Sequence, residues 1–525
     1  IMKKFFVLLL IGCFSISTST FAQKTTAILD LEKGDHKISR HIYGHFSEHL
    51  GRCIYDGIWV GENSSIPNVQ GYRKGVVEAL KNIGIPNLRW PGGCFADDYH
   101  WKDGIGPKDE RPPMINTHWG MVSEDNSFGT HEFLKLCNLL VCNRIDWEPN
   151  KAENVGSGTV KELSQWIEYV NSDIESKMTQ LRKKNGKEDS WYVKYWGIGN
   201  ESWGCGGNMN PTQYYEKMCR YSTYMRSYPD KPLYKVAVGP SGFNPGWTEE
   251  FMKNVAEDGG ANLFSGYSLH YYTVPGDWGD KGSATEFGES EWFTTIRKAL
   301  RLEDLIEREY RIIEKYLPRA DIDLVVDEWG CWHNVEPGTR PGFLYQQNTM
   351  RDAIVAGLSL NIFNNHSDKV KMANIAQTVN VLQTMVLTND KKVIRTPTYH
   401  IFDMYQVHHD ATYLPLKINS HEYIFDDEEI PAVTGSASMD NKGRVHITLT
   451  NADPNKAVSV ECFLDGEKEL KFNRGQILTH SEMNAHNTFE NPDKVTIQEF
   501  NNAEVQEDRI EINIPAKSVI MVEFN

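Results

Sequence analysis

The chain has 525 residues, of which 40% are apolar, 24% charged and 11% aromatic. This composition excludes a disordered, collagen-like or coiled-coil protein, and the length suits two domains if one of them is a large α/β barrel. The formal net charge of −16 would repel phosphate backbones and anionic lipids, so we expect neither nucleic acid nor a membrane surface as a partner.

The N-terminal residues predict export. Lysines at positions 3 and 4 precede a short apolar run from Phe5 to Cys13, and Ala22 ends a segment typical of a cleavage site. We therefore expect a signal peptide over residues 1–22 and a periplasmic or secreted protein. A competing interpretation takes Cys13 as the lipidated residue of a lipoprotein. No later stretch is long and apolar enough to predict a membrane-spanning helix.

Cysteines are scattered along the chain and do not form a metal-binding or disulfide-rich pattern. The chain holds nine of them, and the zinc spacing C-x-x-C is absent from the sequence. We expect most to be buried free thiols, with one or two disulfides left open.

Short β-rich runs alternate with amphipathic helical patterns over residues 41–397. The predicted strands are His41–Phe46, Asn87–Trp90, Tyr192–Ile198, Tyr234–Val238, Phe264–His270, Ile322–Val326 and Ala373–Val379. An eighth is expected between Leu139 and Asn154, where the pattern is least clear. The series fits a closed (β/α)8 TIM barrel or an open doubly wound sheet. No glycine-rich phosphate-binding motif follows the first strand, which favours the barrel.

The remaining residues predict a second, all-β domain. Alternating runs such as Val445–Thr450, Ala457–Phe463 and Val519–Phe524 are separated by turn sequences. This pattern is typical of an antiparallel, jelly-roll-like β-sandwich over residues 398–525. The strand-like segment Thr25–Asp30 lies outside the barrel series, so residues 23–40 are expected to join the sandwich.

Two glutamates stand where predicted barrel strands end. Glu201 follows the strand that ends at Ile198, and Glu328 follows the strand that ends at Val326, three strands later. The carboxyl ends of barrel strands meet at one face, so the two carboxylates can lie opposite each other. Such a pair suits glycoside hydrolysis, in which one carboxyl protonates the leaving oxygen and the other attacks or activates water.

These glutamates, together with the segments Tyr43–Arg52 and Leu88–Gly93, closely resemble the α-L-arabinofuranosidases of glycoside hydrolase family 51. The likeness covers nearly the whole chain beyond the N-terminal segment. It implies retaining, exo-acting hydrolysis of terminal α-L-arabinofuranosyl residues from arabinan, arabinoxylan and arabino-oligosaccharides. Glu201 would be the general acid/base and Glu328 the nucleophile, with no cofactor and no metal. Members commonly form hexamers, so the resemblance also implies a homo-oligomer.

The resemblance assigns further residues to the sugar-binding site: Glu48, Arg89, Cys94, Trp119, Asn200, Tyr272, Trp332 and Gln377. By this likeness the carboxylate and amide side chains would bind the furanose hydroxyls, while Arg89 and Tyr272 would support the catalytic carboxylates. The two tryptophans would form aromatic walls. Cys94 stands where the family often has asparagine.

Three other functions are suggested by parts of the sequence. The segment His45–His49 matches the H-x-x-E-H spacing of one group of zinc proteases, but that motif requires a helix and this segment begins like a strand. A non-catalytic carbohydrate-binding protein would not need both Glu201 and Glu328. An endo-acting β-glucanase or xylanase of the same family group differs in having an open groove in place of a pocket.

Overall fold

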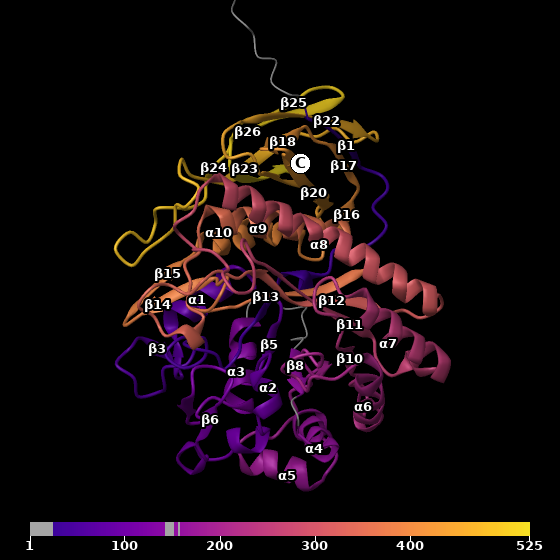
Figure 1. The fold of residues 1–525 in the computed structure, drawn as a ribbon, viewed down its shortest axis with the longest axis vertical. Helices are drawn as coiled ribbons and strands as arrows, with labels where there is room; N and C mark the ends of the chain where they lie inside the picture. Colours follow the sequence, from indigo (N-terminus) through magenta and orange to yellow (C-terminus); the bar gives the residue numbers. More distant parts are fainter. Residues whose placement is uncertain (1–24, 142–151, 156–157) are drawn as a thin grey trace, which may run out of the picture.

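The computed structural model describes residues 25–141, 152–155 and 158–525, and its larger part is a closed barrel (Figure 1). Eight parallel strands follow one another in chain order: β2 (Gly44–Phe46), β5 (Leu88–Trp90), β8 (Ala152–Val155), β9 (Tyr195–Ile198), β10 (Tyr234–Ala237), β11 (Gly266–Thr273), β12 (Asp323–Cys331) and β13 (Val370–Ala376). The last strand pairs with the first, which closes the sheet. The predicted TIM barrel is therefore confirmed.

Several predicted strands differ in their bounds from the observed ones; for example, β12 continues to Cys331, so that Glu328 lies on the strand. Residues Arg40–Tyr43 form a 3-10 turn, begun by the Ser39 side chain, so β2 starts only at Gly44. The expected eighth strand is β8, at the end of the predicted interval; residues 142–151 of that interval lie outside the described part of the chain.

Helices follow the strands and cover the outside of the barrel. They are α1 (Lys74–Asn82), α3 (Thr130–Val141), α4 (Val160–Asn171), α5 (Lys177–Lys184), α6 (Pro211–Tyr224), α7 (Pro245–Asp258), α8 (Glu289–Tyr316), α9 (Met350–Asn365) and α10 (Pro397–Tyr405). Local sequence fixes several of their starts. Thr159 and Asn210 each form a capping box at the start of a helix, and Pro211 stands at the first helical position, where its missing N–H has no cost.

The C-terminal domain is a sandwich of two sheets, ordered β17-β1-β22-β26-β25 and β16-β20-β21-β27-β23-β24. Its strands are β1 (Thr25–Asp30), β16 (Thr412–Leu414), β17 (Leu416–Asn419), β20 (Val433–Met439), β21 (Val445–Asn451), β22 (Val458–Asp465), β23 (Phe472–Thr479), β24 (Gln498–Glu499), β25 (Ala503–Val505), β26 (Arg509–Ile514) and β27 (Ser518–Phe524). The first strand of the described chain, β1, pairs with β17 and β22. In Figure 1 the sandwich lies above the barrel, with α9 and α10 between them.

Small hairpins and a short helix add to the two domains. They are β3 (Asn68–Val69) with β4 (Tyr72–Arg73), β6 (Met114–Asn116) with β7 (Val122–Glu124), β14 (Val386–Asn389) with β15 (Lys392–Arg395), β18 (Glu422–Phe425) with β19 (Glu428–Pro431), and α2 (Phe95–Asp98). The β6–β7 hairpin and α2 both follow β5, so they belong to the mouth of the barrel where its strands end.

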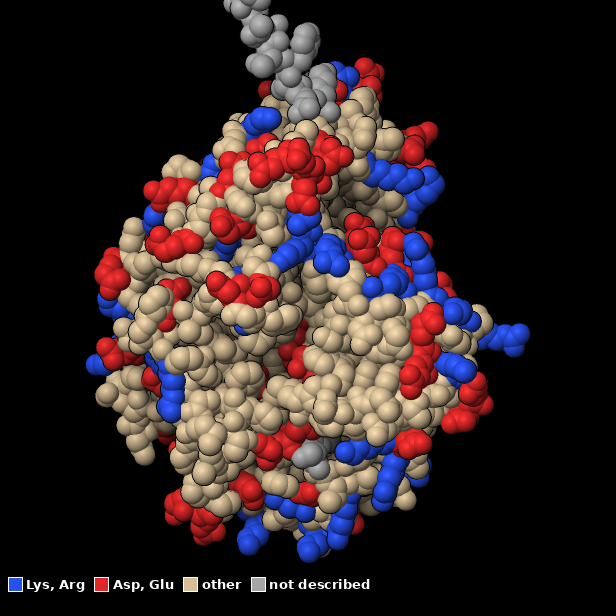
Figure 2. All heavy atoms as spheres, viewed as in Figure 1, with Lys and Arg blue, Asp and Glu red and all other residues tan. Residues whose placement is uncertain are grey.

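Charged side chains of both signs are interspersed on the surface. On the face drawn in Figure 2, acidic and basic residues alternate around a broad uncharged area that is hollowed near its middle. None of the helices within the described ranges is long and apolar enough to cross a membrane.

Candidate active site

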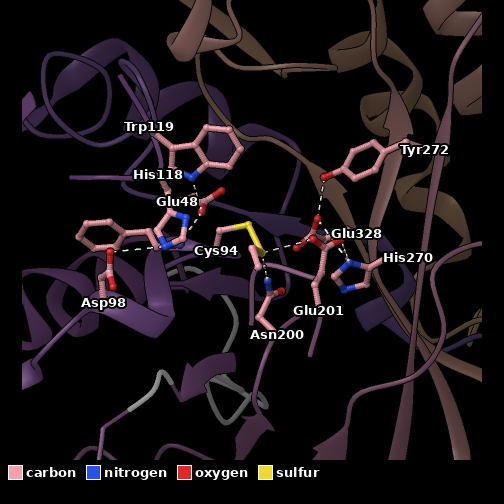
Figure 3. Close-up of a disulfide and its surroundings, with 12 residues drawn as sticks. Glu48, Cys94, Asp98, His118, Trp119, Asn200, Glu201, His270, Tyr272 and Glu328 are labelled. Carbon is pink, nitrogen blue, oxygen red and sulfur yellow. Dashed lines mark hydrogen bonds and ion pairs between the residues drawn. A yellow bond between two sulfur atoms is a disulfide. The ribbon is translucent and has the colours of Figure 1, made fainter. Parts of the chain in front are cut away.

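Two carboxylates face each other at the carboxyl ends of the barrel strands. Glu328 lies on β12, and Glu201 follows β9 in a left-handed backbone conformation with φ 39°. One carboxylate oxygen of each lies within 4.8 Å of the other, and Figure 3 shows the two side chains converging. Retaining glycosidases need their two carboxyl groups about 5 to 5.5 Å apart. The observed separation therefore fits direct attack on the sugar and leaves no room for a water between the two groups.

Glu328 is surrounded by hydrogen-bond donors. Arg89, on β5, donates from Nη1 to Oε1 at 2.7 Å, and Tyr272, on β11, donates from its hydroxyl to Oε2 at 2.7 Å. The Arg89 guanidinium also donates to Oδ1 of Asn200 at 2.7 Å and is buried. Charge-assisted bonds of this kind favour the ionised carboxylate, which is the form that can act as a nucleophile.

Glu201 has different surroundings. Its Oε1 lies 2.9 Å from Nδ1 of His270, whose Nε2 lies 2.9 Å from Oδ1 of Asp327. Burial raises the pKa of Glu201, and repulsion from Glu328 raises it further, against the opposing hydrogen bond from His270. Burial would lower the pKa of His270, but the charges of Glu328 and Asp327 outweigh it and hold that pKa well above its ordinary value. The surroundings of Glu201 therefore favour its protonated form more than water would.

A third carboxylate, Glu48, lies after β2 and accepts hydrogen bonds at both of its oxygens. Its Oε1 accepts from Nε1 of Trp119 at 2.8 Å and from the backbone N–H of Phe95 at 3.1 Å, and its Oε2 accepts from Nε2 of Gln377 at 3.1 Å. Burial, with a further contribution from Glu328, raises the pKa of Glu48 to about 7. Figure 3 shows the Trp119 indole above this carboxylate.

Gly93 leaves open the space between the carboxylates. A methyl group at this position would lie 3.1 Å from Oε1 of Glu328 and 3.5 Å from both carboxylate oxygens of Glu48. Any side chain here would therefore occupy the volume that lies against both acids. The absence of a side chain at Gly93 is what keeps this surface accessible to a small ring.

The structure brings most of the predicted residues together at this face. Those in direct contact with Glu48, Glu201 or Glu328 are Arg89, Trp119, Tyr272 and Gln377, and Asn200 is joined to them through Arg89. Trp332 lies one step further out, since its ring meets Tyr272 edge-on with the centroids 5.0 Å apart.

Cys94 has a partner that the sequence did not reveal. It forms a disulfide with Cys205, and Sγ of Cys205 lies 3.5 Å from Oε2 of Glu201. Other cysteines in the described residues are free thiols, as expected: Cys53, Cys137, Cys219, Cys331 and Cys462. The two sulfur atoms of this disulfide therefore line the site beside Glu201, as Figure 3 shows.

Three residues of the site, His270, Asp327 and Cys205, had no role predicted from the sequence. His270 is part of β11 and Asp327 directly precedes Glu328 on β12, so both stand toward the carboxyl ends of strands. That position was the available signal, because it is where barrel enzymes place their reactive groups. Cys205 carried no comparable signal.

The zinc motif does not form its required geometry. His45 lies on strand β2 and packs against Phe402, with the ring centroids 4.9 Å apart. His49 accepts a hydrogen bond from Nε1 of Trp90 at 3.1 Å through its Nε2. Because the segment is a strand followed by a loop, its histidines do not share one helical face, and the zinc interpretation is wrong.

Comparisons with known proteins agree with this geometry. Residues 79–239 match the family profile of the α-L-arabinofuranosidase 1 domain, and residues 327–518 match that of the α-L-arabinofuranosidase C-terminal domain. An intracellular exo-α-L-arabinofuranosidase of Bacteroides ovatus is 48% identical over 510 residues, or 97% of each chain. The GH51 arabinofuranosidase structure from Xanthomonas axonopodis pv. citri superposes with a TM-score of 0.92 at 42% identity, covering 96% of this chain and 100% of that one. An arabinose complex of the α-L-arabinofuranosidase from Thermotoga maritima gives a TM-score of 0.83 at 30% identity, covering 95% and 99%.

A barrel whose mouth holds two closely opposed carboxylates, packed beside a β-sandwich, defines a glycoside hydrolase. Within that class the chain belongs to the α-L-arabinofuranosidases of glycoside hydrolase family 51. The resemblance carried by its motifs is therefore confirmed.

The expected cellular location is corrected by the same comparisons. The relative from Bacteroides ovatus, aligned over 97% of this chain, is named an intracellular enzyme, which contradicts the prediction of a periplasmic or secreted protein. Two lysines followed by a short apolar run are a compositional signal only, so this pattern alone does not fix the compartment. Residues 1–22, with Cys13, lie outside the described part of the chain.

Proposed function

We propose that this protein removes terminal non-reducing α-L-arabinofuranosyl residues from arabinan, arabinoxylan and arabino-oligosaccharides, with retention of anomeric configuration. The observation that carries the proposal is the pair Glu201 and Glu328, whose carboxylate oxygens lie within 4.8 Å of each other in unlike surroundings. The name of the relative from Bacteroides ovatus supports exo action. Water is the second substrate, and the reaction needs no cofactor.

In the first step Glu328 attacks the anomeric carbon. Arg89 and Tyr272 hold its two oxygens, which orients the carboxylate. As the bond to the sugar forms, the bond from the anomeric carbon to the leaving oxygen breaks, and that oxygen takes the proton of Glu201. The products of this step are a glycosyl ester on Glu328 and a neutral alcohol.

In the second step the roles depend on a change of charge. Esterification removes the negative charge of Glu328, and with it the repulsion that helped to raise the pKa of Glu201. Glu201, now ionised, takes a proton from water, and the water oxygen attacks the anomeric carbon. The ester bond breaks, Glu328 returns to its carboxylate form, and Glu201 is again protonated.

The sugar is positioned by polar groups around the two catalytic glutamates. Glu48, Gln377 and Asn200 present carboxylate and amide atoms to the furanose hydroxyls, while Gly93 leaves space for the ring. Trp119 and Trp332 bound the site with apolar faces, which suit the C–H faces of a sugar. Specific hydroxyl contacts of this kind favour one furanose over a pyranose ring.

The test measures release of nitrophenol from an aryl α-L-arabinofuranoside. Wild type should turn over, and Glu328→Ala should lose about 10³-fold or more in kcat because the nucleophile is gone. Azide should restore part of the activity of that variant and give an arabinosyl azide of inverted configuration. Glu314→Ala, an exposed glutamate of α8, is the control and should match wild type. If the wild type folds but does not turn over this substrate, the proposal is wrong. β-Glucan and xylan would then be the next substrates to test.

A further inference from the structure

Three loops of the barrel mouth meet beside Glu48. The first follows β2 and contains Gly51; the second is the turn of the β6–β7 hairpin, which carries Trp119 and Gly120. The third is the 3-10 turn Pro341–Phe343, which follows β12. These segments come from three different βα-connections, so their contact joins separate parts of the barrel rim.

The three loops approach closely, because glycine stands at each meeting point. A methyl group on Gly342 would lie 2.8 Å from the backbone nitrogen and 2.9 Å from Cα of Gly120. A methyl group on Gly120 would lie 2.7 Å from Cε1 of Phe343, and one on Gly51 would lie 2.6 Å from the carbonyl oxygen of Phe343. Separations this short would force one of the loops to move. The Pro341–Phe343 turn thus fills the space between the other two loops.

The hairpin needs such support. Its strands β6 and β7 have three residues each, and a two-stranded hairpin alone is marginally stable in water. One side of its turn is tied to α2, since Thr117 donates to Oδ2 of Asp98 at 2.6 Å. The other side meets the Pro341–Phe343 turn. Between these two anchors lies Trp119, which donates to Glu48.

We propose that Gly342 is a positioning residue for the sugar site: lacking a side chain, it lets the Pro341–Phe343 turn support the β6–β7 hairpin and so hold the Trp119 indole on Glu48. This inference rests on the proposed function, in which Glu48 binds a furanose hydroxyl. Gly342 itself touches neither substrate nor the catalytic glutamates. Its effect passes through Gly120 and Trp119 to the orientation of the Glu48 carboxylate.

The test is a double-mutant cycle on the aryl arabinofuranoside with Gly342→Ala, Trp119→Phe and the double variant. Gly342→Ala should lower kcat/KM about tenfold, mainly through KM, because displaced binding groups weaken sugar binding. If Gly342 acts through Trp119, the double variant should fall no further than Trp119→Phe alone, within about twofold. Gly246→Ala, where the nearest atom to a new methyl lies 3.6 Å away, is the control and should match wild type.

Two outcomes would overturn the proposal: unchanged kcat/KM in Gly342→Ala, or the same loss on the Trp119→Phe background as on wild type. Thermal unfolding of every variant shows whether the fold is intact. If Gly342→Ala does not fold, Phe343→Ala replaces it in the cycle, since its ring contacts Gly120. Turnover by wild type tests the proposed function separately, so a failed cycle and a failed function are told apart.

Discussion

His270 connects the acid and the nucleophile through its charge. Its Nδ1 lies 2.9 Å from an oxygen of Glu201 and 3.5 Å from Oε2 of Glu328, and Asp327 holds its other nitrogen. The raised pKa of His270 keeps the ring protonated. A positive charge stabilises both neighbouring carboxylates, so His270 lowers the pKa of Glu201 from the still higher value that burial alone would give.

Replacing His270 with Asn should therefore move the pH profile. Without the imidazolium charge the ionised form of Glu201 loses stabilisation, and the pKa of Glu201 rises. The alkaline limb of kcat/KM reports loss of the proton from Glu201, so this limb should shift upward by about one pH unit. Profiles of the variant and of His100→Gln, an exposed histidine, would be compared. An alkaline limb that stays in place would show that His270 carries no charge in this site.

Single residues of the site were predictable to unequal degrees. Glu201 and Glu328 could be found because each follows an apolar strand, and the geometry of a barrel then places them at one face. The pairing of Cys94 with Cys205 could not be found, since these residues are 111 positions apart and only the folded loops bring them together. The contact of Gly342 with Gly120 could not be predicted either, because the only trace of a backbone contact in a sequence is the glycine itself.

At the scale of elements, the disulfide joins two βα-connections. Cys94 begins the segment that contains α2, and Cys205 lies in the loop between β9 and α6 that also holds Glu201. Nδ2 of Asn200 lies 3.7 Å from Sγ of Cys205, so the bridge contacts both Asn200 and Glu201. The bridge therefore restrains the loop that holds Glu201, the proposed acid/base.

Removing this bridge should lower both stability and activity. Cross-linking a loop of about 100 residues stabilises a fold by up to about 4.7 kcal/mol in the chain-entropy model, so Cys205→Ala should melt at a lower temperature. Freedom of the Glu201 loop should also reduce kcat by about tenfold. Dithiothreitol should reproduce both changes in wild type and have no effect on the variant. Cys219→Ala, which removes a free thiol, is the control; equal melting and turnover in both variants would contradict the prediction.

At the scale of the whole molecule, α9 joins the two domains. Every residue from Met350 to Asn364 is buried, because the helix has the barrel on one side and the sandwich on the other. Oδ1 of Asn361 accepts hydrogen bonds from the hydroxyls of Tyr405 at 3.1 Å, Ser436 at 3.0 Å and Thr448 at 2.9 Å. The buried amide of Asn361 thus accepts hydrogen bonds both from helix α10 and from strands of the sandwich.

Asn361→Leu should destabilise the protein without changing its chemistry. The variant leaves several buried hydroxyls without their acceptor, at a cost of about 1 to 3 kcal/mol for each group left unsatisfied. Denaturant unfolding should show an earlier midpoint, while kcat/KM per folded molecule stays at the wild-type value. Asn262→Leu, at an exposed position, should unfold like wild type. An unchanged midpoint in Asn361→Leu would mean that the interface does not depend on this amide.

The two-domain organisation was largely readable from periodicity. Alternation of apolar runs with helical patterns predicted the barrel, and a period of two predicted the sandwich. The position of β8 was not readable, because its sequence Ala-Glu-Asn-Val offers no apolar run. The strands that pair with β1 could not be predicted either, since pairing between distant parts of the chain depends on the assembled sheet.

That pairing of β1 has a consequence for synthesis. Thr25 and His421 form a side-chain hydrogen bond across 396 positions of the chain. β1 lies between β17 and β22, two strands of the sandwich that are synthesised after the barrel. Ribosomes add about 5 to 20 residues per second, so β1 is synthesised roughly 20 to 80 s before β17, the first strand with which it pairs. All eight barrel strands emerge within that interval. The barrel can therefore close first, and β1, the first strand of the described residues, is among the last to pair.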